Sequence, residues 1–175
     1  IFIYKKAIGV TTGILPWNFP FFLIARKMAP ALVTGNTIVV KPSVDSPINA
    51  ILFAEIVHAS GLPKGVFNLV HGAGGEIGQE LAGNPKVGLV SLTGSEPAGR
   101  KVMEAASRNI TKVNLELGGK APAIVLADAN LDLAAKAIVA SRIINSGQVC
   151  NCAERIYVQC EVKEVFTQKL VELMK

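Results

Sequence analysis

The stretch 145–152, Asn-Ser-Gly-Gln-Val-Cys-Asn-Cys, contains the residue types best suited to covalent chemistry. Cys150 follows a helical pattern over 131–144 and precedes an apolar, strand-like run over 155–159, so its side chain can be directed into a cleft at the junction. Gly147 allows a tight turn, and the polar neighbours are typical of a loop that faces a ligand. A thiolate in such a loop can act as a nucleophile. We therefore predict that Cys150 is a catalytic nucleophile.

Two other roles for this cysteine have to be weighed. Free cysteines are among the most buried residue types, and most of them only fill a core. Cys152 lies two positions further on and need not share the exposure of Cys150. A Cys-x-Cys metal site would need a second cluster of ligands, but His58 and His71 are isolated in the sequence. We therefore expect no metal site.

Glu116 is the second candidate for chemistry. It lies near the end of an apolar strand pattern over 111–117 and is followed closely by Gly118 and Gly119. Burial among apolar neighbours would disfavour the charged form of its carboxylate, which suits a general base. The alternative is a residue at a strand end whose carboxylate reaches solvent. We predict Glu116 as the base and expect it to be partly buried.

The elements that must position these residues alternate between strand and helix. In the first helix, Arg26 and Lys27 are expected on the polar side. Short links between alternating elements are typical of a parallel sheet covered on both faces, so we predict an α/β, doubly wound (Rossmann-like) cofactor domain over residues 1–116. The pattern restarts after Lys120, which predicts the start of a second α/β catalytic domain over 117–175. The expected strands are 9–15, 36–40, 66–70, 87–92, 111–117, 123–126 and 155–159, and the expected helices are 21–32, 47–60, a short one ending near 82, 97–107, 131–144 and 161–175.

Ligands of parallel sheets bind at the carboxyl ends of the strands. Gly94 and Ser95 open a helix there, which offers backbone N–H groups and a hydroxyl to a phosphate, although simple helix capping would use the same residues. Gly72 begins a glycine-rich loop whose last spacing is one residue longer than the dinucleotide-binding fingerprint. Lys41 follows a strand and either reaches a ribose or phosphate or is a surface lysine.

Composition excludes several classes. The chain has 175 residues, of which 50% are hydrophobic and 18% charged, so we expect a packed core. The net charge is +5, but the basic residues are scattered and only 6% of the residues are aromatic, which argues against a nucleic-acid surface. Apolar runs are too short to span a membrane. Three cysteines and no signal sequence predict a cytoplasmic location, and both chain ends resemble cuts, which predicts a fragment.

Five motifs resemble those of the aldehyde dehydrogenase superfamily. Leu-Glu-Leu-Gly-Gly-Lys at 115–120 and Gly-Gln-Val-Cys at 147–150 resemble its glutamate and cysteine signatures. Pro-Trp-Asn-Phe-Pro at 16–20, Lys-Pro-Ser at 41–43 and Thr-Gly-Ser at 93–95 match its other motifs in the same order.

Within that superfamily, segments 14–30 and 145–154 are most similar to bacterial lactaldehyde and glycolaldehyde dehydrogenases. The resemblance implies an oxidoreductase that converts a small aldehyde to a carboxylic acid. It also implies that the protein is longer than this chain and forms a homo-oligomer at full length. Cys150 would attack the aldehyde carbon, the Asn18 side chain would hold the resulting oxyanion, and Glu116 would activate water to release the product as a carboxylic acid.

The resemblance also implies a nicotinamide cofactor, NAD or NADP. Lys41 and Ser43 would contact its adenosine ribose and Ser95 its pyrophosphate. Val44 stands where members that prefer NAD usually carry a glutamate, so both cofactors stay open. The other residues that the resemblance places along the cofactor are Leu15, Trp17, Gln79 and Leu117, and the loop patterns add Gly72 and Gly94 as candidates for cofactor binding.

Three alternatives remain at this point. The chain could come from a semialdehyde dehydrogenase of the same superfamily. A dehydrogenase that transfers the acyl group to coenzyme A would not need a base at Glu116. A dinucleotide-binding fragment without catalysis would leave Cys150 with no unusual reactivity.

Overall fold

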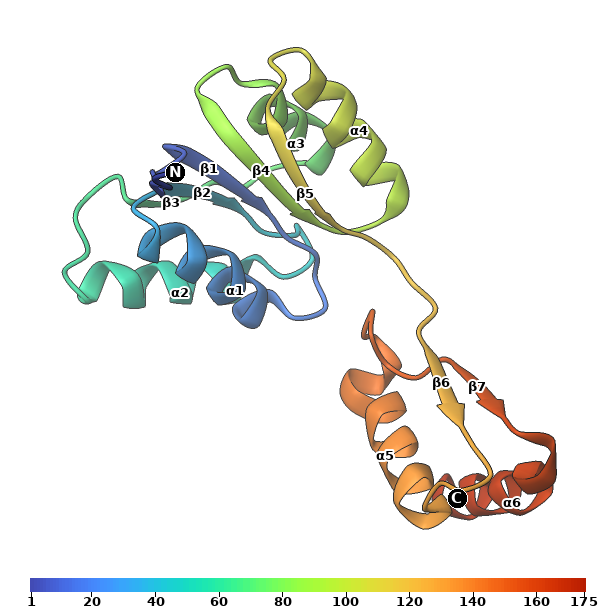
Figure 1. Cartoon of the computed structure of the whole chain (residues 1–175). Helices are drawn as coiled ribbons and strands as arrows, with labels where there is room; N and C mark the ends of the chain where they lie inside the picture. Colours follow the sequence, from blue (N-terminus) through green and yellow to red (C-terminus); the bar gives the residue numbers. More distant parts are fainter. The chain divides into compact units, whose positions relative to one another are not determined.

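The computed structural model describes residues 1–175, which divide into two compact units (Figure 1). Unit 1 is Ile1–Leu117 and unit 2 is Gly118–Lys175. Each unit is described by itself below.

Unit 1 is built on a sheet of five parallel strands in the order β3-β2-β1-β4-β5, which confirms the predicted parallel α/β fold. The chain runs from β1 through β2 to β3 on one side and then crosses back to place β4 and β5 on the other. Its elements in chain order are β1 (Val10–Ile14), α1 (Pro20–Val33), β2 (Thr37–Lys41), α2 (Pro47–Ala59), β3 (Phe67–Leu69), α3 (Gly74–Gly83), β4 (Val87–Thr93), α4 (Glu96–Ser107) and β5 (Lys112–Glu116).

Two apolar clusters hold the helices against the sheet. One joins α1 and α2 to β2, to β3 and to Leu15 just after β1, around Ile24, Ile38 and Phe53. The other joins α3 and α4 to β1 and β4 around Val90 and Val102. The strand order reverses between β1 and β4. Figure 1 shows α1 and α2 on one side of this point and α3 and α4 on the other. This reversal leaves a crevice beyond the carboxyl ends of β1 and β4, where open parallel sheets bind ligands.

Local sequence signals set the ends of the helices. Pro20 lies in the first turn of α1, where its missing N–H is not needed, and Gly35 follows the last turn with a φ of +78°. The Ser95 side chain accepts a hydrogen bond from the backbone N–H of Ala98 and so caps α4. Pro20 and Ser95 thus begin the helices that follow the carboxyl ends of β1 and β4.

Unit 2 has two parallel strands and two α-helices. Val125, Ala135 and Phe166 form its buried centre. Its elements are β6 (Pro122–Val125), α5 (Leu131–Ile143), the short helix η1 (Ile144–Gly147), β7 (Arg155–Val158), the short helix η2 (Cys160–Val162) and α6 (Lys163–Leu173).

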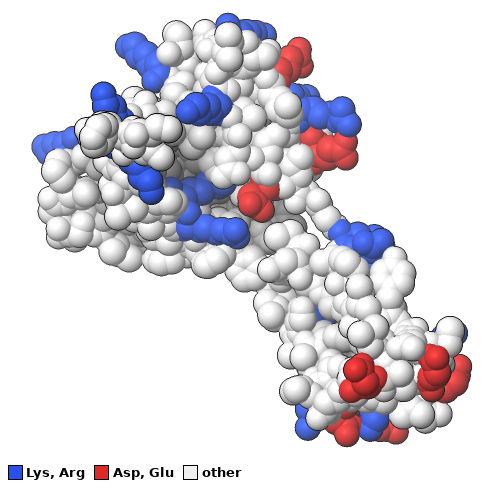
Figure 2. Space-filling model, viewed as in Figure 1, with Lys and Arg blue, Asp and Glu red and all other residues white.

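The face drawn in Figure 2 has no large patch of a single charge. Lysine and arginine side chains are scattered there, with uncharged surface between most of them. No helix combines the length and the apolar character that crossing a membrane requires.

Candidate functional site

The carboxyl edge of the sheet gathers the predicted loops of unit 1. Backbone hydrogen bonds extend the strands into these loops, from Leu15 N to the carbonyl oxygen of Lys41 (2.9 Å) and from Gly94 N to that of Glu116 (3.0 Å). Leu15, Lys41, Gly94 and Glu116 therefore end four neighbouring strands at one edge, as the alternating pattern predicts.

A cleft between α3 and α4 opens beside this edge, with a volume of about 350 Å³. A dinucleotide could place a phosphate there, because the amino ends of helices attract anions and glycines leave room for close approach. A Cβ atom added to Gly74 or Gly75 would meet nothing within 4 Å, so this rim is open. The cleft is lined by Gly74, Gly75, Gly78, Gln79, Ser95 and Lys101, among others.

The loop between β3 and α3 needs glycine at position 72. Gly72 has a φ of +152°, and a Cβ atom there would lie 2.5 Å from Cγ1 of Ile77. A side chain at position 72 would therefore collide with Ile77, so glycine is required there.

Lys41 is buried, with 3% of its surface exposed. The alternative that it is a surface lysine is therefore wrong. Its Nζ donates to the carbonyl oxygens of Pro42 (2.6 Å) and Gly72 (3.1 Å), which ties the ends of β2 and β3 together. Burial lowers the pKa of Lys41 from its ordinary value. An ammonium group has three N–H donors, so one of them is left for a ligand.

The neighbouring corner at the end of β2 is exposed and contains one carboxylate. The Ser43 hydroxyl donates to Oδ2 of Asp45 (3.0 Å), and Val44 is 63% exposed. A ribose at this corner would meet the Ser43–Asp45 pair and an apolar side chain.

The loop between β1 and α1 presents Trp17 and Asn18. Leu15 is buried at the end of β1, Trp17 is 49% exposed and Asn18 is half-buried. Pro16 and Pro20 bracket this loop and restrict its backbone. A side-chain amide held on such a loop has N–H donors that are suited to stabilising a developing oxyanion.

The expected burial of Glu116 is wrong, because its side chain is exposed. The strand β5 is an edge strand, and its residues alternate between exposed and half-buried positions, with Lys112, Asn114 and Glu116 in the exposed row. The sequence expectation assumed an interior strand covered on both faces. A carboxylate in the exposed row is accessible to water, which a general base for hydrolysis needs.

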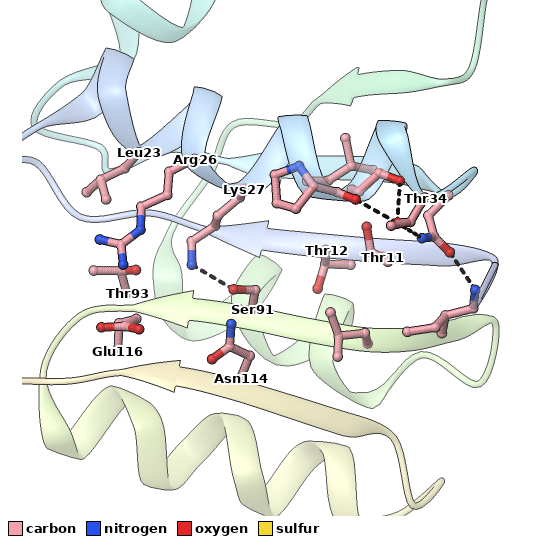
Figure 3. Close-up of a pocket in the computed structure, with 16 residues that line it drawn as sticks. Thr11, Thr12, Leu23, Arg26, Lys27, Thr34, Ser91, Thr93, Asn114 and Glu116 are labelled. Carbon is pink, nitrogen blue, oxygen red and sulfur yellow. Dashed lines mark hydrogen bonds between the residues drawn. The ribbon is translucent and has the colours of Figure 1, made fainter. Parts of the chain in front are cut away.

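A second cleft, of about 350 Å³, lies between α1 and strands β1, β4 and β5 and includes Glu116 in its lining (Figure 3). Figure 3 shows Lys27 directed at Ser91 on β4. Arg26, Thr93 and Glu116 lie together at one end of this cleft.

Lys27 is buried, so the expectation that it lies on the polar side of α1 is wrong. Its Nζ donates to the Ser91 hydroxyl at 2.7 Å. Lys27 shares one helical stripe with Leu23 and Ile24 at spacings of four and three residues, and both of these are buried. The spacing of Lys27 from these apolar residues indicates burial, whereas its charge led to the prediction that it is exposed.

Burial lowers the pKa of Lys27 to about 8, and Arg26 contributes in the same direction, while the negative charge of Glu116 opposes the shift. The unfolded state binds more protons than the folded state between this pKa and the ordinary value of 10.5. The contribution of Lys27 to the free energy of unfolding therefore rises with pH between about 8 and 10.5. Below about pH 8 both states are protonated and the contribution is constant.

We expect Lys27→Met to remove this pH dependence. Relative to the variant, the parent should gain about 2 kcal/mol in free energy of unfolding between pH 7 and 9.5, since each unit of pKa shift corresponds to about 1.4 kcal/mol. Urea unfolding of both proteins at several pH values measures the difference. A difference that is flat with pH would show that Lys27 titrates as an ordinary surface lysine.

Cys150 lies in unit 2, in the loop between η1 and β7. Cys150 is exposed while Cys152 is buried, as the different environments of the two positions allow. The turn before Cys150 is unusual, because Asn145, Ser146 and Gly147 have φ values of +49°, +56° and +79°. Left-handed conformations at residues other than glycine cost roughly 1 kcal/mol or more each, and they cluster at functional sites.

The predicted site residues are thus distributed over both units. Unit 1 brings together the cofactor candidates and places Asn18 and Glu116 on loops and strand ends of the same sheet edge. Unit 2 contains Cys150. A joint catalytic constellation of the three residues stays a prediction. No group of three or more His, Cys, Asp or Glu residues gathers to hold a metal ion.

Sequence reasoning missed three basic residues in the two clefts. These are Arg26 and Lys27 beside Glu116, and Lys101 beside Ser95. Lys101 lies on the second turn of a helix that opens at a strand end, so its position relative to Ser95 was a usable signal.

Comparison with known proteins gives concordant results. The protein-family model described as "Aldehyde dehydrogenase family" matches residues 1–175. Lactaldehyde dehydrogenase of Escherichia coli (strain K12) is 69% identical over the whole chain, which covers 36% of that protein. Succinate-semialdehyde dehydrogenase (NADP+) of the same organism is 48% identical over 170 residues, which are 97% of this chain and 35% of that protein.

Structural comparison agrees. A crystal structure of lactaldehyde dehydrogenase from Escherichia coli superposes with a TM-score of 0.95 and 70% identity, covering 98% of this chain and 36% of that one. The chain thus spans about a third of the length of these relatives. The similarity to the lactaldehyde dehydrogenase group that segments 14–30 and 145–154 indicated is confirmed.

Proposed function

Because the chain belongs to the aldehyde dehydrogenase family, we propose that the full-length protein oxidises an aldehyde to a carboxylic acid with NAD+ or NADP+. The observation that supports this most strongly is an exposed Cys150 three residues after a left-handed turn, in a chain that matches the family from end to end. Formation of reduced cofactor that depends on added aldehyde tests the proposal. Its absence with both cofactors and a panel of small aldehydes would contradict it.

In the first half-reaction, the Cys150 thiolate adds to the aldehyde carbon and forms a C–S bond, and the carbonyl electron pair moves to oxygen. The Asn18 side-chain N–H and the Cys150 backbone N–H donate to this oxyanion. The bound nicotinamide supplies a hydride acceptor. Loss of hydride from the former aldehyde carbon leaves a thioester on Cys150.

In the second half-reaction, Glu116 takes a proton from water, and the resulting hydroxide attacks the thioester carbon. The C–S bond breaks, and the Cys150 thiolate leaves with its electron pair. The products are a carboxylate and, after Glu116 releases its proton, two protons and one reduced cofactor per aldehyde. The exposure of Glu116 in its cleft is consistent with access of water to the base.

Unit 1 offers a site that fits the cofactor. The cleft between α3 and α4 would hold the pyrophosphate at Ser95 and the amino ends of the helices, with Lys101 as an additional cation. Ser95 already accepts from Ala98 N, but its hydroxyl proton can still be donated to a phosphate. Lys41 and Ser43 would meet the ribose.

We propose small hydroxyaldehydes such as lactaldehyde or glycolaldehyde as substrates, since the lactaldehyde dehydrogenase relative is 69% identical. A semialdehyde with a second carboxylate is the alternative, supported by the 48% identity to the succinate-semialdehyde enzyme. The presence of Glu116 argues against acyl transfer to coenzyme A. A dinucleotide-binding protein without catalysis would not require the exposed Cys150.

Cofactor choice is proposed to depend on Val44. A carboxylate at this position would accept hydrogen bonds from the two ribose hydroxyls of NAD, each contributing roughly 1.5 to 3 kcal/mol, and would repel a 2′-phosphate. We expect the parent to accept NADP with a preference over NAD of at most about two orders of magnitude. Val44→Glu should shift the ratio of kcat/KM values toward NAD, mainly by weakening the use of NADP.

Val44→Gln is the matched control, because glutamine has the size of glutamate but carries no charge. Steady-state kinetics with both cofactors in the three proteins give the ratios. Asp45 is the other carboxylate at this corner, so Asp45→Asn should move the ratio toward NADP. Exclusive use of NAD by the parent, or the same ratio in Val44→Glu, would rule out control by this position.

A further inference from the structure

The loop that carries Cys150 is held from within unit 2 by one guanidinium group. Arg142, near the end of α5, donates from Nη1 to Sγ of Cys152 at 3.0 Å and, at a longer 3.5 Å, to the carbonyl oxygen of Gly147. The Cys152 thiol itself lies 3.6 Å from the same carbonyl oxygen. Gly147 and Cys152 flank Cys150 on either side. A single side chain therefore contacts both ends of the nucleophile loop.

The turn at Gly147 is packed directly on Arg142. A Cβ atom at Gly147 would lie 3.2 Å from the backbone oxygen of Arg142 and 3.3 Å from its Cζ, and the φ of +79° already favours glycine. The two preceding residues, Asn145 and Ser146, are also left-handed. A backbone in this conformation persists only when its surroundings fix it, and Arg142 is half-buried against it.

The far end of the loop is fixed as well. Cys152 is 3% exposed, and its backbone N–H donates to the carbonyl oxygen of Val149 at 3.3 Å. The next backbone N–H, that of Ala153, donates to the Ser141 hydroxyl on α5 at 3.3 Å. The exposed Cys150 side chain is thus the apex of a loop whose two ends are both tied to α5.

We propose that Arg142 is a positioning residue for Cys150, acting through the Cys152 thiol and the Gly147 carbonyl. This inference rests on the proposed role of Cys150 as the nucleophile. The planar guanidinium can donate to two acceptors in a fixed geometry, whereas a lysine ammonium is a compact charge without that fork. Cys152 then serves as an acceptor for Arg142 and takes no part in the chemistry.

Removal of this contact should affect the covalent step and leave cofactor binding intact, because Arg142 is not among the residues proposed to hold the cofactor. In the full-length protein, Arg142→Met should slow the first-turnover formation of reduced cofactor by about 10- to 100-fold, the loss typical of a reacting group displaced by up to 1 Å. The aldehyde KM and the cofactor Kd should change little. Arg142→Lys should recover part of the rate.

Three further variants complete the test. Lys136→Met removes an exposed cation from the same helix and should behave as the parent. Cys152→Ser keeps an acceptor for Arg142 and should retain most of the rate, whereas Cys152→Ala should lose several-fold. If Arg142→Met fails to fold, shown by loss of its helical circular dichroism signal, the comparison of the serine and alanine variants decides. Equal rates in those two variants would then overturn the proposal.

A first-turnover rate in Arg142→Met equal to that of the parent would overturn the positioning role, as would an equal loss in Lys136→Met. Failure of the proposed function is distinguished by Cys150→Ala. If that variant still oxidises aldehyde, the nucleophile is misassigned whatever the Arg142 variants do. If it is inactive while Arg142→Met is unaffected, only the positioning role is wrong.

Discussion

Replacement of Cys150 by alanine should abolish aldehyde oxidation by the full-length protein while its cofactor binding stays intact. The loss should reach about four orders of magnitude or more, since removal of a catalytic nucleophile leaves only the rate that binding and oxyanion stabilisation provide. Cofactor affinity should change little, because the residues proposed to hold the cofactor, in the cleft between α3 and α4, do not include Cys150. Steady-state rates and a cofactor titration measure the two properties separately.

The two other cysteines provide internal controls. Cys160 is exposed like Cys150 but lies in η2, so Cys160→Ala should keep the activity of the parent. Cys152 is buried, and Cys152→Ser should keep most of it. If the Cys152 variant is the inactive one and Cys150→Ala is active, the assignment of the nucleophile is wrong.

Replacement of Glu116 by glutamine should separate the two half-reactions. Glutamine has nearly the same shape but cannot accept a proton from water, so the thioester should form and then persist. We expect one equivalent of reduced cofactor in a rapid first turnover, followed by a steady rate lower by about two to four orders of magnitude. Rapid mixing with a small hydroxyaldehyde measures both phases.

Added hydroxylamine provides a control for this variant, because it attacks a thioester without needing a base to activate water. It should restore turnover in Glu116→Gln and release the acyl group as a hydroxamate. Steady turnover in Glu116→Gln equal to that of the parent, without hydroxylamine, would remove Glu116 as the essential base.

Much of the fold could be predicted from the sequence, because strand and helix signals agreed along the chain. Prolines and glycines bounded the elements, and β-branched runs marked buried strands such as β2, so the alternation led directly to a parallel sheet. The gathering of loops at its carboxyl edge followed from the topology alone.

The environments of individual residues were harder to predict. The strand of Glu116 resembled an interior strand, but only the strand order shows that β5 is at an edge. Lys27 was assigned to the surface by its charge, although its helical stripe and Ser91, 64 residues away in sequence, favour burial. The contact between Arg142 and Cys152 also depends on a left-handed turn that residue types alone did not predict.

The most direct test of the proposed mechanism is the mass of the Cys150 peptide after the first turnover. Glu116→Gln, mixed with lactaldehyde and oxidised cofactor and then quenched in acid, should yield a peptide containing Cys150 that has gained the acyl group of the substrate. The amount of this adduct should equal the amount of reduced cofactor formed in the burst. Reduced cofactor without any acyl group on Cys150, or an acyl group on Cys152 instead, would contradict a thioester mechanism at Cys150.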